Sequence, residues 1–120
     1  MADDHGPFAR LELLQGTLDL IILQTLRWGP RHGYGLSRMI QARSDDVLQV
    51  DTGSLYPALH RLEKKKLVRA SWAKSDNNQR VRVYELTAAG HRQLATERSR
   101  WQQLTQAMQS IMSAPPPEEA

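Results

Sequence analysis

The residues best suited to chemistry in this 120-residue chain lie close together, between Ser54 and Lys64. Ser54, Pro57, Arg61 and Lys64 recur at helical spacing, which puts them on one side of a helix, and His60 flanks them. A helix with hydroxyl and cationic groups along one side suits the major groove of DNA, where Arg commonly reads guanine and other polar groups bind phosphate. An ordinary amphipathic surface helix with a solvated lysine run is the alternative interpretation.

The reactive residue types do not form a catalytic or metal-binding motif. The histidines His5, His32, His60 and His91 are scattered without ligand-like spacing, and Ser54 has only His60 as a nearby base. The sequence contains no HExxH, Walker or GxSxG motif, and it contains no cysteine. We therefore expect no enzyme, no metal and no cofactor, and a reducing, cytoplasmic location.

Composition and charge support a soluble protein that binds a polyanion. The chain is 40% hydrophobic and 24% charged, with a net charge of +3. Its first residues are acidic, and its longest apolar run, Leu20 to Leu23, is too short to cross a membrane. Eight basic residues but only the acids Glu63 and Asp76 fall between His60 and Arg82: Arg61, Lys64, Lys65, Lys66, Arg69, Lys74, Arg80 and Arg82. Such a local basic patch is typical of a nucleic-acid reader.

The element that carries these residues is a helix within Val50 to Val68. Its buried stripe consists of Leu55, Ala58, Leu59 and Leu62. Asp51 or Thr52 is suited to cap its start, and a second helix over about 35–43 precedes it across a short loop. Two short helices joined by a turn, the second of them basic, predict a helix-turn-helix.

A β-hairpin is predicted directly after this helix. Residues 67–74 and 81–86 alternate as strands do, and residues 75–80 are polar turn formers. The asparagines at the tip tolerate positive φ, which a hairpin tip commonly requires. A hairpin after a helix-turn-helix is a wing, and Lys74, Arg80 and Arg82 on it are candidate DNA contacts.

Two further helices carry more apolar surface than one small domain covers. A first helix over Leu11–Leu26 is apolar almost all round, so we expect a partner subunit to cover part of it. A last helix, capped by Thr87 and ending near Met112, repeats apolar residues at a/d spacing. The predicted dimer interface comprises Leu14, Leu18, Ile22, Leu94, Trp101, Leu104, Met108 and Ile111. The alternative is that the last helix folds back on its own domain.

Four sequence segments resemble the PadR family of bacterial transcriptional regulators over roughly residues 11–104. They are LQGTL from Leu14, HGYG from His32, GSLYPALHRLE from Gly53 and YELTAAG from Tyr84. The resemblance implies a winged helix-turn-helix, a dimer made by the last and first helices, and repression of nearby genes. In similar proteins a tryptophan of the last helix stacks on planar aromatic ligands, and Trp101 occupies the corresponding position. Lys66 and Asn77-Asn78 depart from glycines that are usual in the family.

Together these observations predict a mainly α fold with a small β-hairpin, in which a winged helix-turn-helix precedes a long C-terminal dimerisation helix. The expected divisions are a flexible arm (1–9), the DNA-binding domain (10–86), the dimerisation helix (87–112) and a disordered tail (113–120). The predicted DNA contacts are Tyr34, Thr52, Ser54, Tyr56, Pro57, His60, Arg61, Lys64, Lys74, Arg80 and Arg82. The expected partners are an inverted-repeat operator, a second copy of the chain and a planar aromatic effector that contacts Trp101. The alternative for Trp101 is that it merely fills the dimer interface. The rival hypothesis is a ligand- or protein-binding adaptor that keeps the fold without specific DNA binding.

Overall fold

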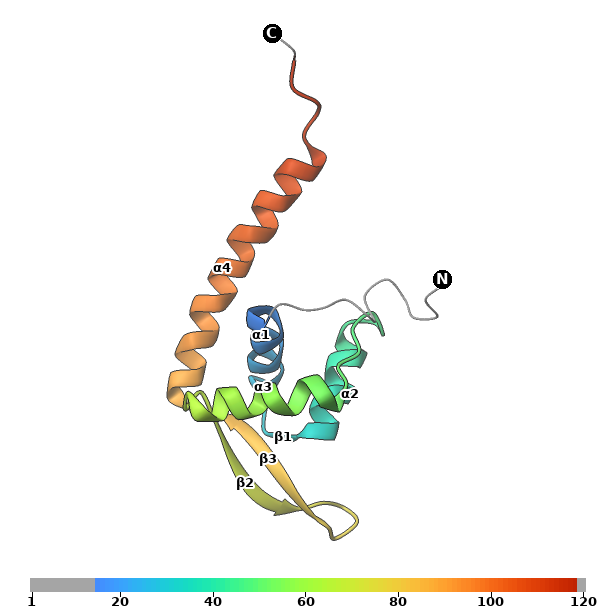
Figure 1. Cartoon of the computed structure of the whole chain (residues 1–120), viewed down its shortest axis with the longest axis vertical. Helices are drawn as coiled ribbons and strands as arrows, with labels where there is room; N and C mark the ends of the chain where they lie inside the picture. Colours follow the sequence, from blue (N-terminus) through green and yellow to red (C-terminus); the bar gives the residue numbers. More distant parts are fainter. Residues whose placement is uncertain (1–14, 119–120) are drawn as a thin grey trace.

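The computed structural model describes residues 15–118 and confirms the predicted fold class (Figure 1). Along the chain the elements are α1 (Gln15–Leu26), β1 (Arg31–His32), α2 (Gly33–Arg43), α3 (Thr52–Lys64), β2 (Val68–Lys74), β3 (Arg80–Leu86) and α4 (Ala88–Ser113). The N-terminal arm and the predicted helical turn that contains the interface candidate Leu14 lie outside the described residues. None of the helices between residues 15 and 118 is long and apolar enough to cross a membrane.

The hydrophobic core lies where α1, α2, α3, the sheet and the start of α4 meet. The four residues predicted as the buried stripe of α3 are all in it, with exposed fractions of 1% or less. The other members are Leu18, Ile22, Leu23, Leu26, Leu36, Ile40, Val50, Val68, Tyr84, Leu86 and Leu94. Because one face of α3 is held so completely, its opposite face is fixed in orientation toward solvent.

Side chains that accept backbone hydrogen bonds start α2 and α3. The Nδ1 of His32 accepts from the backbone N–H of Gly35 at 3.0 Å, and Asp51 accepts from that of Ser54 at 2.9 Å. Such caps satisfy N–H groups that lack partners in the first turn of a helix. Ser37 of α2 also donates to the carbonyl of Val50 at 3.0 Å, which ties the turn between the two helices to α2.

The sheet has one strand more than the predicted hairpin. Its order is β1-β3-β2, and both pairings are antiparallel. In the wing, Trp72 lies opposite Arg82 and Lys74 lies opposite Arg80. Asn78 at the wing tip has φ 62°, as its residue type predicts. The two residues of β1, Arg31 and His32, are too few to show an alternating pattern in the sequence.

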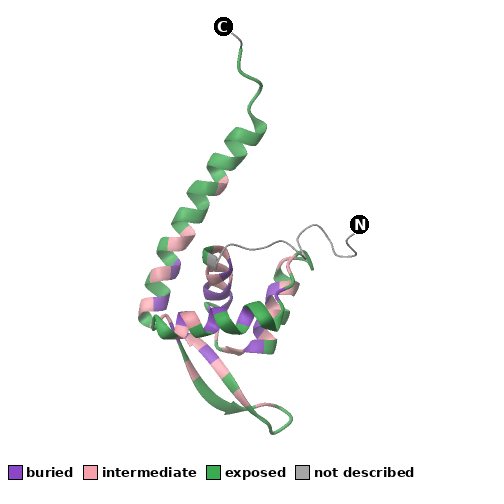
Figure 2. Cartoon of the chain, viewed as in Figure 1, coloured by how far each residue is buried: buried purple, intermediate pink, exposed green. Residues whose placement is uncertain are grey.

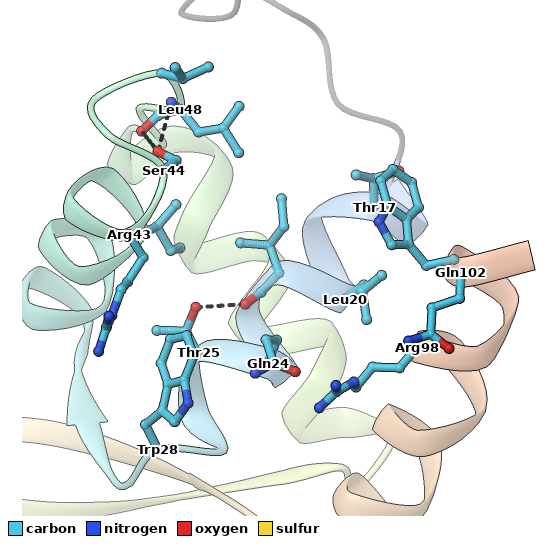
Figure 3. A pocket seen from close by; sticks show the side chains of 14 residues that line it. Thr17, Leu20, Gln24, Thr25, Trp28, Arg43, Ser44, Leu48, Arg98 and Gln102 are labelled. Atoms are coloured by element: carbon cyan, nitrogen blue, oxygen red, sulfur yellow. Dashed lines mark hydrogen bonds between the residues drawn. The ribbon is translucent and has the colours of Figure 1, made fainter. Parts of the chain in front are cut away.

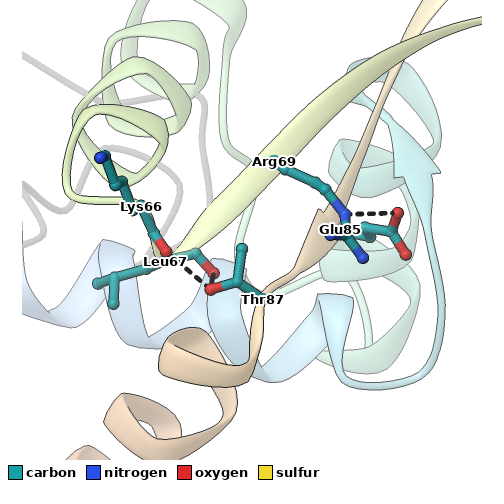
Figure 4. A network of polar contacts seen from close by, with 5 residues as sticks. All are labelled: Lys66, Leu67, Arg69, Glu85 and Thr87. Atoms are coloured by element: carbon teal, nitrogen blue, oxygen red, sulfur yellow. Dashed lines mark hydrogen bonds and ion pairs between the residues drawn. The ribbon is translucent and has the colours of Figure 1, made fainter.

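A polar junction anchors α4 to the end of α3 (Figure 4). Lys66 has φ 63°, the left-handed geometry that usually favours glycine. The Thr87 hydroxyl donates to the Lys66 carbonyl at 2.7 Å, and the Thr87 N–H donates to the Leu67 carbonyl at 3.1 Å. The Gly90 N–H donates to the Thr87 hydroxyl at 3.0 Å, and a Cβ at Gly90 would collide with the Leu67 carbonyl. The direction of α4 is therefore set by residues 66 and 67.

Beyond this junction α4 extends away from the body, and the molecule as a whole measures 68 × 39 × 21 Å (Figure 1). Almost all residues of its outer part are exposed, and Thr105 is the one of intermediate exposure between Trp101 and Ser113 (Figure 2). Four predicted interface residues are among the exposed ones: Trp101, Leu104, Met108 and Ile111. Leu18, Ile22 and Leu94, in contrast, are already buried within the single chain, with at most 7% exposed. Within the single chain these three residues therefore have almost no surface left for a partner, in contrast to the four residues of outer α4.

Candidate nucleic-acid interface

The free face of α3 is centred on Pro57, His60 and Lys64. All three are exposed, as are Thr52 and Ser54 in the first turn. This face lies opposite the buried stripe, as helical geometry requires. The sequence predicts Ser54, Pro57, Arg61 and Lys64 on this face with His60 beside them; in the structure His60 is fully on the exposed face, whereas Arg61 is of intermediate exposure at its edge.

Arg61 lies at the edge of this face and is engaged by α1. Its Nη2 donates to Oδ1 of Asp19 at 2.9 Å. The two side chains are 32% and 13% exposed, so the ion pair is largely shielded from water. The Arg61 guanidinium therefore points toward α1 rather than outward from the free face of α3. The predicted role of Arg61 as a reader of bases is therefore at odds with the contact that it makes.

Tyr56 of α3 and Tyr34 of α2 lie near the point where α3 meets the start of α2. The Tyr56 ring lies against Gly33 so closely that a Cβ on that glycine would approach the ring Cζ within 2.7 Å. Tyr34 is 65% exposed, and its hydroxyl accepts from Nη1 of Arg38 at 2.8 Å. Arg38 was not among the predicted contacts, although its i+4 spacing from Tyr34 puts the two on one face of α2. Tyr34 and Arg38 thus form a second exposed polar group beside α3.

The wing carries its basic side chains on the face that continues from the core. Arg80 and Arg82 lie on the same face of β3 as the buried Tyr84, because alternate residues of a strand share a face. Burial is the main cause that raises the pKa of Tyr84, and the nearby Arg82 opposes it. Nη2 of Arg82 donates to Oε2 of Glu63 at 3.0 Å, which joins the wing to α3. The α3 face and the basic wing face thus adjoin.

A separate pocket of about 710 Å³ lies between α1, the end of α2 with its following loop, and α4 (Figure 3). Trp101 lines it, as does Trp28, whose contribution the sequence analysis missed. Arg98 of α4 reaches across toward Gln24 of α1 (Figure 3). The buried Oε1 of Gln24 has no hydrogen-bond partner in the described part of the chain. The pocket is therefore mostly apolar, with aromatic walls and a few polar groups.

No cluster of metal-ligating side chains occurs among residues 15–118.

The helix-turn-helix, the basic wing and the long final helix define a winged helix-turn-helix protein of the class that regulates transcription. The family model described as "Transcriptional regulator PadR-like family" matches residues 22–96. The chain belongs to this family, which confirms the resemblance noted in its sequence. Its family and its structural relatives are thus transcriptional regulators.

Individual relatives match over most of their length. A PadR-like transcriptional regulator from Bacillus cereus is 25% identical with a TM-score of 0.74, and the match covers 85% of this chain and 97% of that one. A transcriptional regulator from Clostridium thermocellum is also 25% identical, with a TM-score of 0.73 and coverages of 80% and 93%. An uncharacterized protein from Lysinibacillus sphaericus is 27% identical over 103 residues, which are 86% of this chain and 94% of that protein.

Proposed function

We propose that the chain is a homodimeric, sequence-specific DNA-binding regulator that represses nearby genes until a small ligand releases it. The observation that carries this proposal is the adjoining arrangement of the free α3 face and the basic wing face, joined through Glu63 and Arg82. A helix of this size fits the major groove, and cations beside it favour the phosphate backbone.

The proposed contacts divide into two kinds. His60, at the centre of the free face, reads base edges, while Pro57 and Tyr56 fix how closely α3 approaches them. Phosphate contacts come from Tyr34, Thr52, Ser54, Lys64, Lys74 and Arg80, which set the register on the duplex without reading its sequence. Arg61 and Arg82 are each held by a carboxylate, so we assign them to the orientation of α3 and the wing.

The proposed dimer forms through the outer part of α4. Trp101, Leu104, Met108 and Ile111 are between 44% and 70% exposed, and they follow one another at a/d spacing. Packing the same stripe of a second copy against them would remove this apolar surface from water. Two recognition helices held about 34 Å apart would meet successive major grooves, so the operator is expected to be an inverted repeat.

The proposed effector is a planar aromatic compound bound beside Trp101. The pocket offers two tryptophans, and stacking on an indole adds about 0.5–1.5 kcal/mol to the free energy of area burial. A ligand that binds one spacing of the subunits better than another would shift the distance between the recognition helices. A panel of planar aromatics should quench tryptophan emission in the wild type and in Trp72→Leu, but not in Trp101→Leu. If no compound distinguishes the variants, Trp101 is a packing residue only.

The DNA-binding part is tested by comparing two substitutions on the free face. Lys64→Ala should weaken binding to operator and unrelated duplexes alike, because a phosphate contact carries no sequence information. His60→Ala should instead weaken operator binding selectively and relax the base preference at one position of each half-site. Arg92→Ala removes a cation from an exposed position on α4 and is the matched control. If Lys64→Ala binds DNA no more weakly than Arg92→Ala, α3 does not contact the duplex as proposed.

A further inference from the structure

The exposed aromatic residue of the wing, Trp72, lies on the same face as its cations. Trp72 and Lys74 on β2 lie opposite Arg82 and Arg80 on β3. Toward the body this face is apolar and buried, with Val68 opposite Leu86. Toward the tip it becomes cationic, and Trp72 is 56% exposed. With more than half of its surface exposed, the Trp72 side chain keeps much of its area free for contacts other than core packing.

Trp72 is in contact with both arginines of β3. The guanidinium carbon of Arg80 lies 4.4 Å from the centroid of the indole ring, and that of Arg82 lies 5.5 Å from it. Both distances are within the range of cation–π attraction. A guanidinium that lies over a ring presents its flat face to the indole and leaves its N–H groups, which point outward in its own plane, available to an anion. Stacking on Trp72 and binding to phosphate are thus compatible.

The two arginines differ in what else holds them. Arg82 is tied to Glu63 of α3, and its charge is compensated by that carboxylate. Arg80 forms no ion pair with any side chain in the described part of the chain, and its contact with Trp72 is what restrains it. A free arginine side chain loses rotamer entropy when it is immobilised, and a phosphate contact must otherwise overcome that loss. A platform that orders Arg80 beforehand reduces this cost.

The two faces of the wing differ in how their charges are paired. On the outer face Arg69 pairs with Glu85 at 3.1 Å, an arrangement of opposite charges that suits a free hairpin. On the inner face Lys74 is directly opposite Arg80, and like charges at that position disfavour the hairpin. A polyanion lying along the inner face would remove this repulsion.

We propose that Trp72 is a positioning residue that holds the Arg80 guanidinium at the wing surface to contact a DNA phosphate, while Arg82 and Glu63 fix the wing to α3. This inference rests on the proposed DNA-binding function. Trp72 itself acts through Arg80 and makes no base-specific contact. Its contribution is therefore independent of the DNA sequence.

The test is a double-mutant cycle with a fluorescently labelled random-sequence duplex of about 30 base pairs, because phosphate contacts do not require the operator. By anisotropy, Trp72→Leu is expected to weaken binding about two- to fivefold, the equivalent of one exposed cation–π contact. Arg80→Gln should weaken it at least as much and reduce the salt slope by up to about 0.9. In the Arg80→Gln background, Trp72→Leu should cause no further loss.

Three controls separate the positioning of Arg80 from general effects on the wing. Trp72→Phe should restore most of the affinity, since a phenyl ring still attracts a guanidinium. Arg92→Gln removes an exposed arginine of α4, which lies outside the wing; it should leave duplex binding unchanged. Trp72→Thr is a second non-aromatic variant with good strand propensity, and it must behave like Trp72→Leu.

Each outcome has one meaning. If Trp72→Leu and Trp72→Thr bind the duplex like the wild type, the positioning role is wrong while the proposed function stands. If the losses from Trp72→Leu and Arg80→Gln add, Trp72 contacts DNA directly and the inference is also wrong. If the wild type shows no salt-dependent duplex binding, the proposed function itself fails, and the inference fails with it.

Discussion

At the scale of single residues, the structure divides the cations of the candidate interface into two groups. Lys64, Lys74 and Arg80 have no carboxylate partner within residues 15–118, whereas Arg61 and Arg82 each have one. The sequence shows that all five are basic and near one another. It does not show which are paired, because Asp19 is 42 positions from Arg61 and only the packing of α1 against α3 brings the two together.

Arg61 gives the most direct residue-scale prediction. Arg61→Ala leaves the Asp19 carboxylate, only 13% exposed, without its partner, so the free energy of unfolding should fall by about 1–3 kcal/mol. Arg69→Ala is the matched control, since it breaks an exposed pair and should cost less than about 1 kcal/mol. Urea denaturation measures both. An Arg61→Ala variant of unchanged stability, with weaker DNA binding and a flatter salt slope, would instead support the role of base reader or phosphate contact.

At the scale of elements, local sequence signals predicted where α3 and α4 begin. The caps Asp51 and Thr87 are where their side-chain chemistry predicts. The strand β1 was missed, because Arg31 and His32 pair with β3 only through contacts distant in sequence. The sequence did not show for the same reason that Arg61, rather than His60, turns toward the body. The apolar stripe fixes which side of α3 is buried, but only tertiary contacts such as that of Arg61 with Asp19 decide which flanking residue turns inward.

The junction between α3 and β2 offers a test at the element scale. Lys66 adopts φ 63° where glycine is usual in the family, so Lys66→Gly should stabilise the protein by about 1 kcal/mol in thermal or urea unfolding. Lys65→Gly is the matched control, because Lys65 has φ −79° and its substitution should destabilise by a similar amount. Equal effects of the two substitutions would mean that residue 66 is not held in left-handed geometry.

At the scale of the whole molecule, the outer part of α4 carries large apolar side chains that the single chain leaves exposed. From Leu104 to Ser113 every residue except Thr105 is exposed, yet this part carries a regular apolar stripe. The sequence predicted this stripe from its spacing. It could not separate Leu18, Ile22 and Leu94, which belong to the core, from Leu104 and the residues that follow, since both sets show the same periodicity.

Leu104→Asp tests the proposed dimer. Leu104 is 52% exposed in the single chain, so an aspartate there costs a monomer little, but it would place an unpaired charge in a dry dimer interface at a cost of several kcal/mol. Sedimentation should show monomers, far-UV dichroism should remain helical, and operator binding should be lost. Arg92→Asp, on an exposed part of α4 near its start, is the control. A Leu104→Asp variant that stays dimeric would mean that the subunits meet elsewhere.

The central claim, that α3 and the wing bind duplex DNA, is tested most directly by one salt series. The affinity for a duplex from the gene's own upstream region is compared with that for an unrelated duplex of equal length. We expect log affinity to fall linearly with log salt for both duplexes, with a slope of about 0.9 per phosphate contacted. At physiological salt the upstream duplex should bind at least about 10³-fold more tightly. Affinity that does not change with salt, or that is equal for both duplexes, would contradict the account.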